Sequence, residues 1–322
     1  MNDDKANKYK VISLFTGCGG SDLGMIGGFN YLGKKYQSLK FDIVHASDID
    51  KFAQETYNHN FDHNLDLIDI NNLPDSDIVV GGFPCQSFST VNPNKNPFDE
   101  RGQLYKKMAE ILRIKKPKAF IAENVKGMMT LKKGTIFKSI LKEFSKSGYN
   151  INYKLINATS FGVPQKRERV FIVGIRKDLE IDFEFPEETH DLTTTNKLGA
   201  VIDSLEPEDE KYYFSKRAVE GMKKAKNNMK RGLYQSLDEP CLTITSHLAK
   251  VSLNSRDPVL LVNPEKELYR RFSPREAARI QSFPDNFEFP VSEHQAYRQI
   301  GNAIAPVVMW HVSKKLHKIL QN

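Results

Sequence analysis

The chain has 322 residues, 39% of them hydrophobic, and a formal net charge of +7. This length supports one large core or two unequal domains, and the positive charge suits a polyanionic partner because Lys and Arg displace counterions from phosphate. No run reaches the roughly 20 apolar residues of a membrane span, and the first ten residues lack the apolar stretch of a signal peptide, so we expect a cytoplasmic protein. Cys18, Cys85 and Cys241 lie far apart in no metal-ligand spacing, which argues against a disulfide framework and a metal site.

The first 175 residues alternate between short apolar runs and amphipathic stretches, which predicts strands separated by helices. The strands are expected at 10–15, 41–46, 77–82, 118–123 and 170–175, and the helices at 51–60, 103–114 and 134–147. Such alternation is typical of an α/β fold with a doubly wound, mostly parallel sheet. Its site is expected at the carboxyl ends of the strands.

The pattern changes in the second half of the chain. Residues 182–210 are acidic, 211–232 are basic, and 235–262 contain short strand-like runs. Helical periodicity returns at 274–281 and again from about 303 to the end. We therefore expect an α/β domain, an inserted smaller domain, and a C-terminal segment that returns to the first domain.

A glycine-rich turn, Gly17-Cys18-Gly19-Gly20, follows the first predicted strand and opens a helix, with Ser21 or Asp22 available as the cap. Asp48 follows the second strand, where a carboxylate can accept both ribose hydroxyls of a nucleoside. The turn alone could be a packing feature, and its spacing is not the dinucleotide pattern. Together, the turn and the acid favour a nucleoside cofactor site.

Cys85 leaves the third strand through Gly-Gly-Phe-Pro and enters a polar loop with Gln86 and Ser87. A lone intracellular cysteine usually packs in the core, but this one should lie at the strand tip. Glu123 ends another apolar run and should reach the same edge, although an ordinary helix-initiating acid fits its position equally well.

Alternation places Gln165, Arg167 and Arg169 on one side of the chain just before a strand, and a solvated charge run is the common alternative. Together with Cys85 and Glu123 they match one reaction. A thiolate added at carbon 6 of cytosine makes carbon 5 nucleophilic, a carboxylic acid at N3 stabilises the adduct, and a guanidinium holds O2. Either arginine could supply that guanidinium, and nearby arginines would lower the pKa of the thiol.

The motifs resemble those of the DNA (cytosine-5) methyltransferase family, bacterial restriction-modification type, nearly end to end. In chain order they are FTGCGG (15–20), DIDKFAQETY (48–57), GGFPCQSFS (81–89), DERGQLY (99–105), ENV (123–125), QKRER (165–169), RRFSPREAARIQSFP (270–284) and RQIGNAIAPVV (298–308). The resemblance implies a Rossmann-like, S-adenosylmethionine-dependent methyltransferase fold. It also implies a discontinuous catalytic domain, 1–185 with 291–322. The smaller inserted target-recognition domain, together with a hinge, is expected at 186–290.

The resemblance further implies roles for single residues, with S-adenosylmethionine as methyl donor and no metal. The expected cofactor-binding residues are Phe15, Gly17, Gly19, Gly20, Asp48, Ile49, Asp66 and Asn302, with Asp69 as the alternative to Asp66. The expected catalytic residues are Cys85, Glu123, Arg167 and Arg169, and the expected substrate-binding residues are Gln86, Ser87 and Gln165. Asp48 should bind the ribose, Ile49 should pack on the adenine, and Asn302 should help to close the site.

The implied function is methyl transfer to carbon 5 of a cytosine within a short double-stranded DNA sequence, with base flipping and a covalent Cys85 adduct. The resemblance further implies the protective methylase of a type II restriction-modification system. We expect a monomer and a cognate endonuclease that acts on the same site without a stable complex.

Four alternatives fit the sequence less well. The tRNA-modifying branch of the family carries a Cys-Phe-Thr signature that is missing here, and exocyclic-amino methylation needs a Pro-Pro-aromatic loop where this chain has Phe-Pro-Cys-Gln. A non-catalytic DNA-binding protein would not need all the catalytic residue types. A dehydrogenase does not fit the glycine spacing.

Overall fold

The computed structural model describes residues 8–66, 72–83, 104–203, 209–226, 233–250 and 258–321. Their centre is a seven-stranded sheet with the order β5-β4-β1-β6-β7-β10-β8. Its strands are β1 (Tyr9–Leu14), β4 (Phe41–Ser47), β5 (Leu65–Asp66), β6 (Ile78–Gly81), β7 (Ala119–Val125), β8 (Tyr149–Asn157) and β10 (Glu168–Arg176). Only β10 runs antiparallel to its neighbours in this sheet, so the predicted mostly parallel α/β sheet is confirmed.

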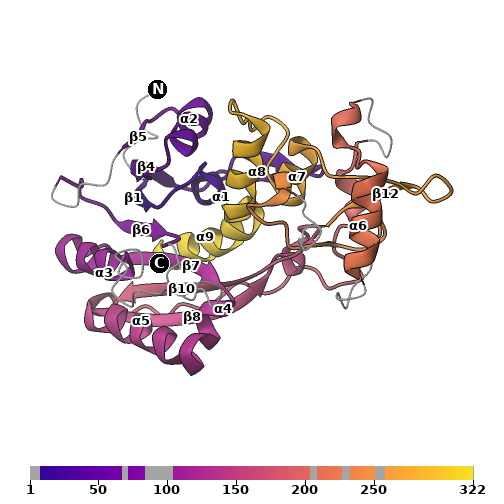
Figure 1. The fold of residues 1–322 in the computed structure, drawn as a ribbon. Helices are drawn as coiled ribbons and strands as arrows, with labels where there is room; N and C mark the ends of the chain where they lie inside the picture. Colours follow the sequence, from indigo (N-terminus) through magenta and orange to yellow (C-terminus); the bar gives the residue numbers. More distant parts are fainter. Residues whose placement is uncertain are drawn as a thin grey trace.

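Alternate side chains of the central strands enter two separate cores, one on each face of the sheet. Val11 and Val80 pack in the core that includes α1 (Gly20–Ile26) and α9 (Pro306–Leu320). Ile12 and Val79 pack in the core formed with α3 (Leu104–Lys115) and α5 (Thr135–Lys146). Helices thus cover both faces (Figure 1), which explains why the strands are apolar at consecutive positions.

Most elements lie within two or three residues of their predicted bounds. The predicted helices appear as α2 (Lys51–Asn60), α3, α5, α7 (Pro274–Ile280) and α9. The elements not predicted include β5, β8, the hairpin of β2 (Phe29–Tyr31) and β3 (Lys34–Tyr36), and α8 (Glu293–Asn302). β8 is an edge strand with polar residues on both sides of its apolar ones, so its sequence lacks the continuous apolar run of the central strands.

The predicted cap of the first helix is wrong. The residue before α1 is Gly19, with φ 93°, and no side chain caps the helix. Ser21 and Asp22 lie inside α1, and the Asp22 side chain is fully buried. Its carboxylate accepts hydrogen bonds from the hydroxyls of Ser13 and Tyr57 instead of from the helix backbone.

The middle of the chain forms a lobe that projects from the sheet (Figure 1, orange). It contains α6 (Lys216–Lys226), β12 (Leu260–Asn263) and β13 (Leu268–Arg270), around a small apolar cluster of Val219, Met222, Val259 and Tyr269. Neighbouring parts of the same region pack elsewhere. Cys241, in β11 (Cys241–Leu242), joins the core between α7 and α8, and β11 pairs with β9 (Gln165–Lys166). The domain boundaries at residues 185 and 291 stay predictions.

The last helix returns to the beginning of the chain. α9 packs against α1, and buried Val307, Met309, Trp310 and Leu316 join the same core as Val11 of β1. The core on this face of the sheet therefore includes residues from both ends of the described chain. Within the described part of the chain, no helix combines the length and apolarity needed to cross a bilayer.

Replacing Leu316 with Ala should lower the free energy of unfolding by about 2–5 kcal/mol, because its side chain is fully buried between α9 and the sheet. Urea unfolding followed by circular dichroism measures this. Lys318→Ala, an exposed change two residues further along the same helix, should leave the unfolding midpoint in place. Equal midpoints for the two variants would contradict the packing of α9.

Candidate active site

Several predicted site residues meet at the carboxyl edge of the sheet, the edge where β1, β4, β6 and β7 end. Phe15 follows β1, Asp48 follows β4, and Glu123 lies near the end of β7. Arg169, at the start of the antiparallel β10, pairs with Val125 and so reaches the same edge. The fold thus brings groups from four separate segments together, at the place where doubly wound sheets bind ligands.

The chain leaves β6 beside Glu123. A Cβ added to Gly82 would lie 3.4 Å from Glu123 Oε2, and Asn124 Nδ2 donates a hydrogen bond to the Phe83 carbonyl at 2.8 Å. The predicted roles of Cys85, Gln86 and Ser87 fall just beyond this point, outside the described residues, as does the alternative Asp69.

The glycine-rich turn after β1 is held in shape by Asp48. The Gly17 N–H donates to Asp48 Oδ2 at 2.8 Å, and the Asp50 N–H donates to Asp48 Oδ1 at 2.9 Å. Gly17 has φ 58°, a conformation that strains residues with a side chain, and a Cβ there would meet no atom within 4 Å. The turn therefore leaves open space beside the Asp48 carboxylate.

The surroundings of this space fit a nucleoside cofactor. Ile49, next to Asp48, is 84% exposed, which suits an apolar side chain that packs on an adenine ring. β5 pairs with β4, so Asp66 lies beside Ser47 at the same edge with its side chain 65% exposed. Asn302 is exposed at the end of α8, and Ile304 approaches the turn: a Cβ on Gly20 would lie 2.5 Å from the Ile304 carbonyl oxygen.

Glu123 and Arg169 form a shielded ion pair. Arg169 Nε lies 3.3 Å from Glu123 Oε1, and the two side chains are only 18% and 11% exposed, respectively. Burial raises the pKa of Glu123, while the charges of Arg169 and Arg167 act in the opposite direction. A carboxyl group in this state can donate a hydrogen bond nearer neutral pH than a surface glutamate can.

Arg167 faces the interior instead of the edge. Its side chain is 3% exposed, and Nη2 donates to the carbonyls of Gly301 and Ala303 at 3.0 and 2.9 Å. Nη1 donates to the Ile244 carbonyl at 3.2 Å. The guanidinium thus joins the segment after β11 to the end of α8.

Gln165 is fully buried and belongs to the same interior network. Its Nε2 donates to the Ile280 carbonyl at 3.2 Å and to Gln281 Oε1 at 2.7 Å, and its Oε1 accepts the Ile244 N–H at 3.1 Å. The structure therefore brings Arg169 to Glu123 and places Gln165 and Arg167 behind them. The catalytic and substrate-binding roles of these residues stay predictions.

Sequence reasoning missed two residues of this network, Gln281 and Gly301. Gln281 Nε2 donates to the Ala303 carbonyl at 2.5 Å. A Cβ on Gly301 would lie 2.2 Å from the Thr245 carbonyl carbon and 2.3 Å from the Ser246 nitrogen. A glycine inside a helical pattern is a known signal of close backbone approach, and Gly301 carries it.

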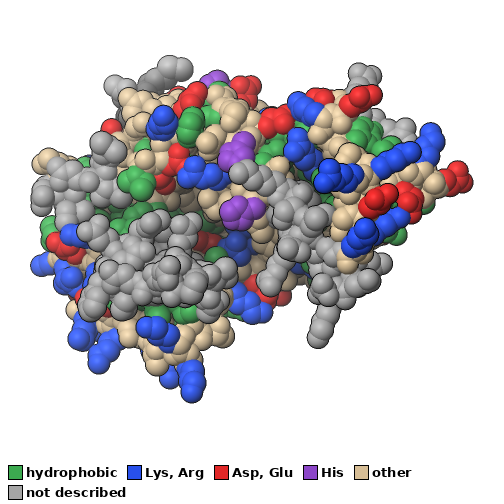
Figure 2. Space-filling model, viewed as in Figure 1, with side chains coloured by type: hydrophobic (Ala, Val, Ile, Leu, Met, Phe, Trp, Pro, Cys, Tyr) green, Lys and Arg blue, Asp and Glu red, His purple; other side chains and the backbone are tan. Residues whose placement is uncertain are grey.

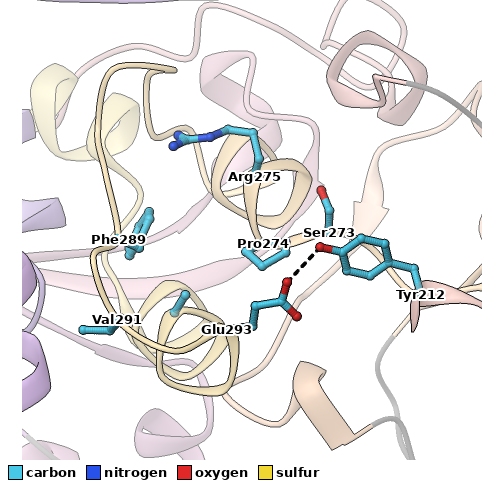
Figure 3. Close-up of a pocket in the computed structure, with 8 residues that line it drawn as sticks. Tyr212, Ser273, Pro274, Arg275, Phe289, Val291 and Glu293 are labelled. Atoms are coloured by element: carbon cyan, nitrogen blue, oxygen red, sulfur yellow. Dashed lines mark hydrogen bonds between the residues drawn. The ribbon is translucent and has the colours of Figure 1, made fainter. Parts of the chain in front are cut away.

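A separate groove lies at the base of the lobe (Figure 3). It has a volume of about 410 Å³ and is lined by Tyr212, Ser273, Pro274, Arg275, Phe289, Val291, Glu293 and Ala296. The Tyr212 hydroxyl donates to Glu293 Oε1 at 2.9 Å across it. The residues predicted for the active site are absent from this lining, so the groove is distinct from the carboxyl edge.

Comparison with known proteins identifies the class. Residues 9–318 match the family of C-5 cytosine-specific DNA methylases. The chain is similar to the Type II methyltransferase M1.ScrFI of Lactococcus lactis subsp. cremoris, with 36% identity covering 98% of this chain and 80% of the relative. It is also similar to the Type II methyltransferase M.NlaX of Neisseria lactamica, with 35% identity covering 97% of each chain.

The fold resembles that of the S. pombe Dnmt2 methyltransferase, with a TM-score of 0.76 and 20% identity over 98% of this chain and 99% of the other. The chain belongs to the C-5 cytosine-specific DNA methylase family. It is a DNA (cytosine-5) methyltransferase, and its methyl donor is S-adenosylmethionine.

Replacing Gly301 with Ala should reduce DNA methylation about 100-fold, because the new Cβ cannot fit against the Thr245–Ser246 backbone and must displace the end of α8. Initial rates of methyl incorporation measure the effect. Gly127→Ala is the matched control, since a Cβ at this helical glycine meets no atom within 4 Å. A Gly301→Ala variant as active as Gly127→Ala would show that the close approach is unimportant.

Proposed function

We propose that this enzyme is the protective methylase of a type II restriction-modification system, which methylates one cytosine within a short double-stranded DNA sequence in the cytoplasm. Support comes from the Type II methyltransferases that are 33–36% identical to it over nearly its full length. The observation that carries the proposed mechanism is the shielded Glu123–Arg169 pair beside the exit of β6. A cognate endonuclease for the same sequence and a monomeric enzyme complete the proposal.

In the proposed reaction, the Cys85 thiolate forms a bond to carbon 6 of the flipped-out cytosine, and the electron pair moves to carbon 5. Bound S-adenosylmethionine supplies an electrophilic methyl group. Carbon 5 then bears both the methyl group and its original hydrogen. Loss of that hydrogen as a proton and release of the thiolate from carbon 6 restore the aromatic ring.

Glu123 and Arg169 stabilise the charge that this addition creates on the base. The raised pKa of Glu123 lets its carboxyl group hydrogen-bond to or protonate N3, and the Arg169 guanidinium beside it can hold O2. The sequence leaves both arginines open for this contact. We assign it to Arg169, because both Nη atoms of Arg167 donate to backbone carbonyls in the interior.

The positively charged surface suits the DNA backbone. On α6, Lys216, Arg217 and Lys224 are exposed on the side opposite the buried Val219 and Met222. Lys and Arg side chains also gather on this lobe in Figure 2. We assign sequence recognition to residues 186–290 and phosphate contacts to the basic face of α6, so that binding weakens with increasing salt.

Incubation of the protein with labelled S-adenosylmethionine and unmethylated genomic DNA, with tRNA in parallel, tests this function. We expect label in DNA only, with 5-methylcytosine in one short sequence context. Cys85→Ser should bind DNA and cofactor without methyl transfer, whereas Cys241→Ser, the same change at a cysteine buried in the core, should retain it. Label in tRNA alone would refute DNA as the substrate. Turnover by Cys85→Ser would refute Cys85 as the nucleophile.

The activity should fall as the pH rises through the raised pKa of Glu123, because only the protonated carboxyl group can donate to N3. Glu123→Gln should lower kcat about 10²–10⁴-fold and abolish this alkaline decrease, since an amide donates at every pH but transfers no proton. Glu143→Gln, which removes the carboxylate of the Arg113 ion pair on α5, is the control and should keep the wild-type profile. If the alkaline decrease persisted in Glu123→Gln, a group other than Glu123 would be responsible for it.

A further inference from the structure

A buried carboxylate lies directly beneath the glycine-rich turn. The Asp22 side chain is fully buried, and three hydroxyl groups donate to it: Ser13 at 2.6 Å, Ser21 at 3.0 Å and Tyr57 at 2.7 Å. These donors come from β1, α1 and α2. Asp22 thus fastens the strand before the turn, the helix after it, and a second helix to a single point.

The contact continues from Tyr57 to His63. Their Oη and Nε2 atoms are 2.6 Å apart. The one hydroxyl proton of Tyr57 is directed at Asp22, so His63 Nε2 must carry the proton of the second hydrogen bond. His63 therefore donates to Tyr57 and Tyr57 donates to Asp22, in a chain of hydrogen bonds that runs from a half-buried imidazole to a fully buried carboxylate.

Tyr57 also touches the turn itself. A Cβ added to Gly19 would lie 3.0 Å from Tyr57 Cδ2 and 2.3 Å from Phe61 Cε2, and the two rings stack with centroids 4.3 Å apart. On the strand side, Thr16 Oγ1 donates to Ser13 Oγ at 2.9 Å. The Tyr57 ring packs against the turn at Gly19, and its hydroxyl donates a hydrogen bond to Asp22.

The arrangement is costly to maintain. Burial raises the pKa of Asp22 to about 6, and the hydroxyls of Ser13, Tyr57 and Ser21 act in the opposite direction. At neutral pH the protein therefore carries a buried negative charge where an apolar side chain could pack. A fully hydrogen-bonded charge of this kind holds its donors in one arrangement, which an apolar contact would not do.

We propose that Tyr57 and His63, acting through Asp22, are positioning residues that keep the turn at residues 15–20 in the shape that binds S-adenosylmethionine. The inference rests on the proposed placement of the cofactor at this turn. No atom of either residue lies within 4 Å of a Cβ built on Gly17, so we assign their effect on the cofactor to the backbone of the turn.

The test compares two tyrosine variants by calorimetric titration with S-adenosylmethionine in the absence of DNA, and by steady-state kinetics. Tyr57→Phe keeps the ring and removes both hydrogen bonds. We expect cofactor affinity to fall about 10-fold and the KM for S-adenosylmethionine to rise equally, with kcat at saturating cofactor and the KM for DNA unchanged. Tyr149→Phe is the matched control, because Tyr149 is 1% exposed, donates to the Pro117 carbonyl at 2.8 Å, and lies in the core on the other face of the sheet.

Two His63 variants extend the test. His63→Gln retains an N–H donor for Tyr57 and should bind the cofactor nearly as well as the wild type, whereas His63→Leu should resemble Tyr57→Phe. The proposal would be overturned if Tyr57→Phe and Tyr149→Phe bound the cofactor equally well. It would also be overturned if Tyr57→Phe lowered only kcat or only the affinity for DNA. If the wild type itself bound no S-adenosylmethionine, the proposed cofactor site would fail before this inference was reached.

Discussion

The buried guanidinium of Arg167 determines how the parts of this enzyme meet. It donates to the backbone carbonyls of Ile244, Gly301 and Ala303, which are far from it in sequence. Both Nη atoms of this buried charge are used in these contacts, and removing the side chain would leave three carbonyls without their donor. The segment after β11, the end of α8 and the start of β10 are therefore fixed to one another behind the carboxyl edge.

Residues 301–304 lie between the segment after β11 and the glycine-rich turn after β1. A Cβ on Gly301 would meet the Thr245–Ser246 backbone, and a Cβ on Gly20, in the glycine-rich turn, would meet the Ile304 carbonyl. The lobe is attached through paired segments. The Phe214 N–H donates to the Tyr269 carbonyl, and the Arg271 N–H donates to the Tyr212 carbonyl, so the segment that leads into α6 is paired with the segment that follows β13. Between α6 and β12 the chain returns to the core through β11, so the lobe is connected to the rest of the structure at more than one place.

The sequence predicts the sheet, its helices and the edge where the site lies, because continuous apolar runs identify buried strands and functional groups follow their ends. It does not predict that Arg167 is directed to the interior and Arg169 to Glu123. Alternation places Gln165, Arg167 and Arg169 on one side, but Gln165 belongs to β9, which pairs with β11, and Arg169 belongs to β10 in the main sheet. Neighbouring residues thus have different partners, which no local pattern reveals. The burial of Asp22 is hidden in the same way, since an acid near a helix start is usually a cap.

The return of α9 to α1 has a consequence for biosynthesis. β1 and α1 are made well before α9, yet they share a core with its Val307, Met309 and Leu316. A nascent chain that contains β1 and α1 without α9 therefore exposes apolar surface, a state that is prone to aggregation. The core on this face of the sheet can therefore close only after α9 has been made.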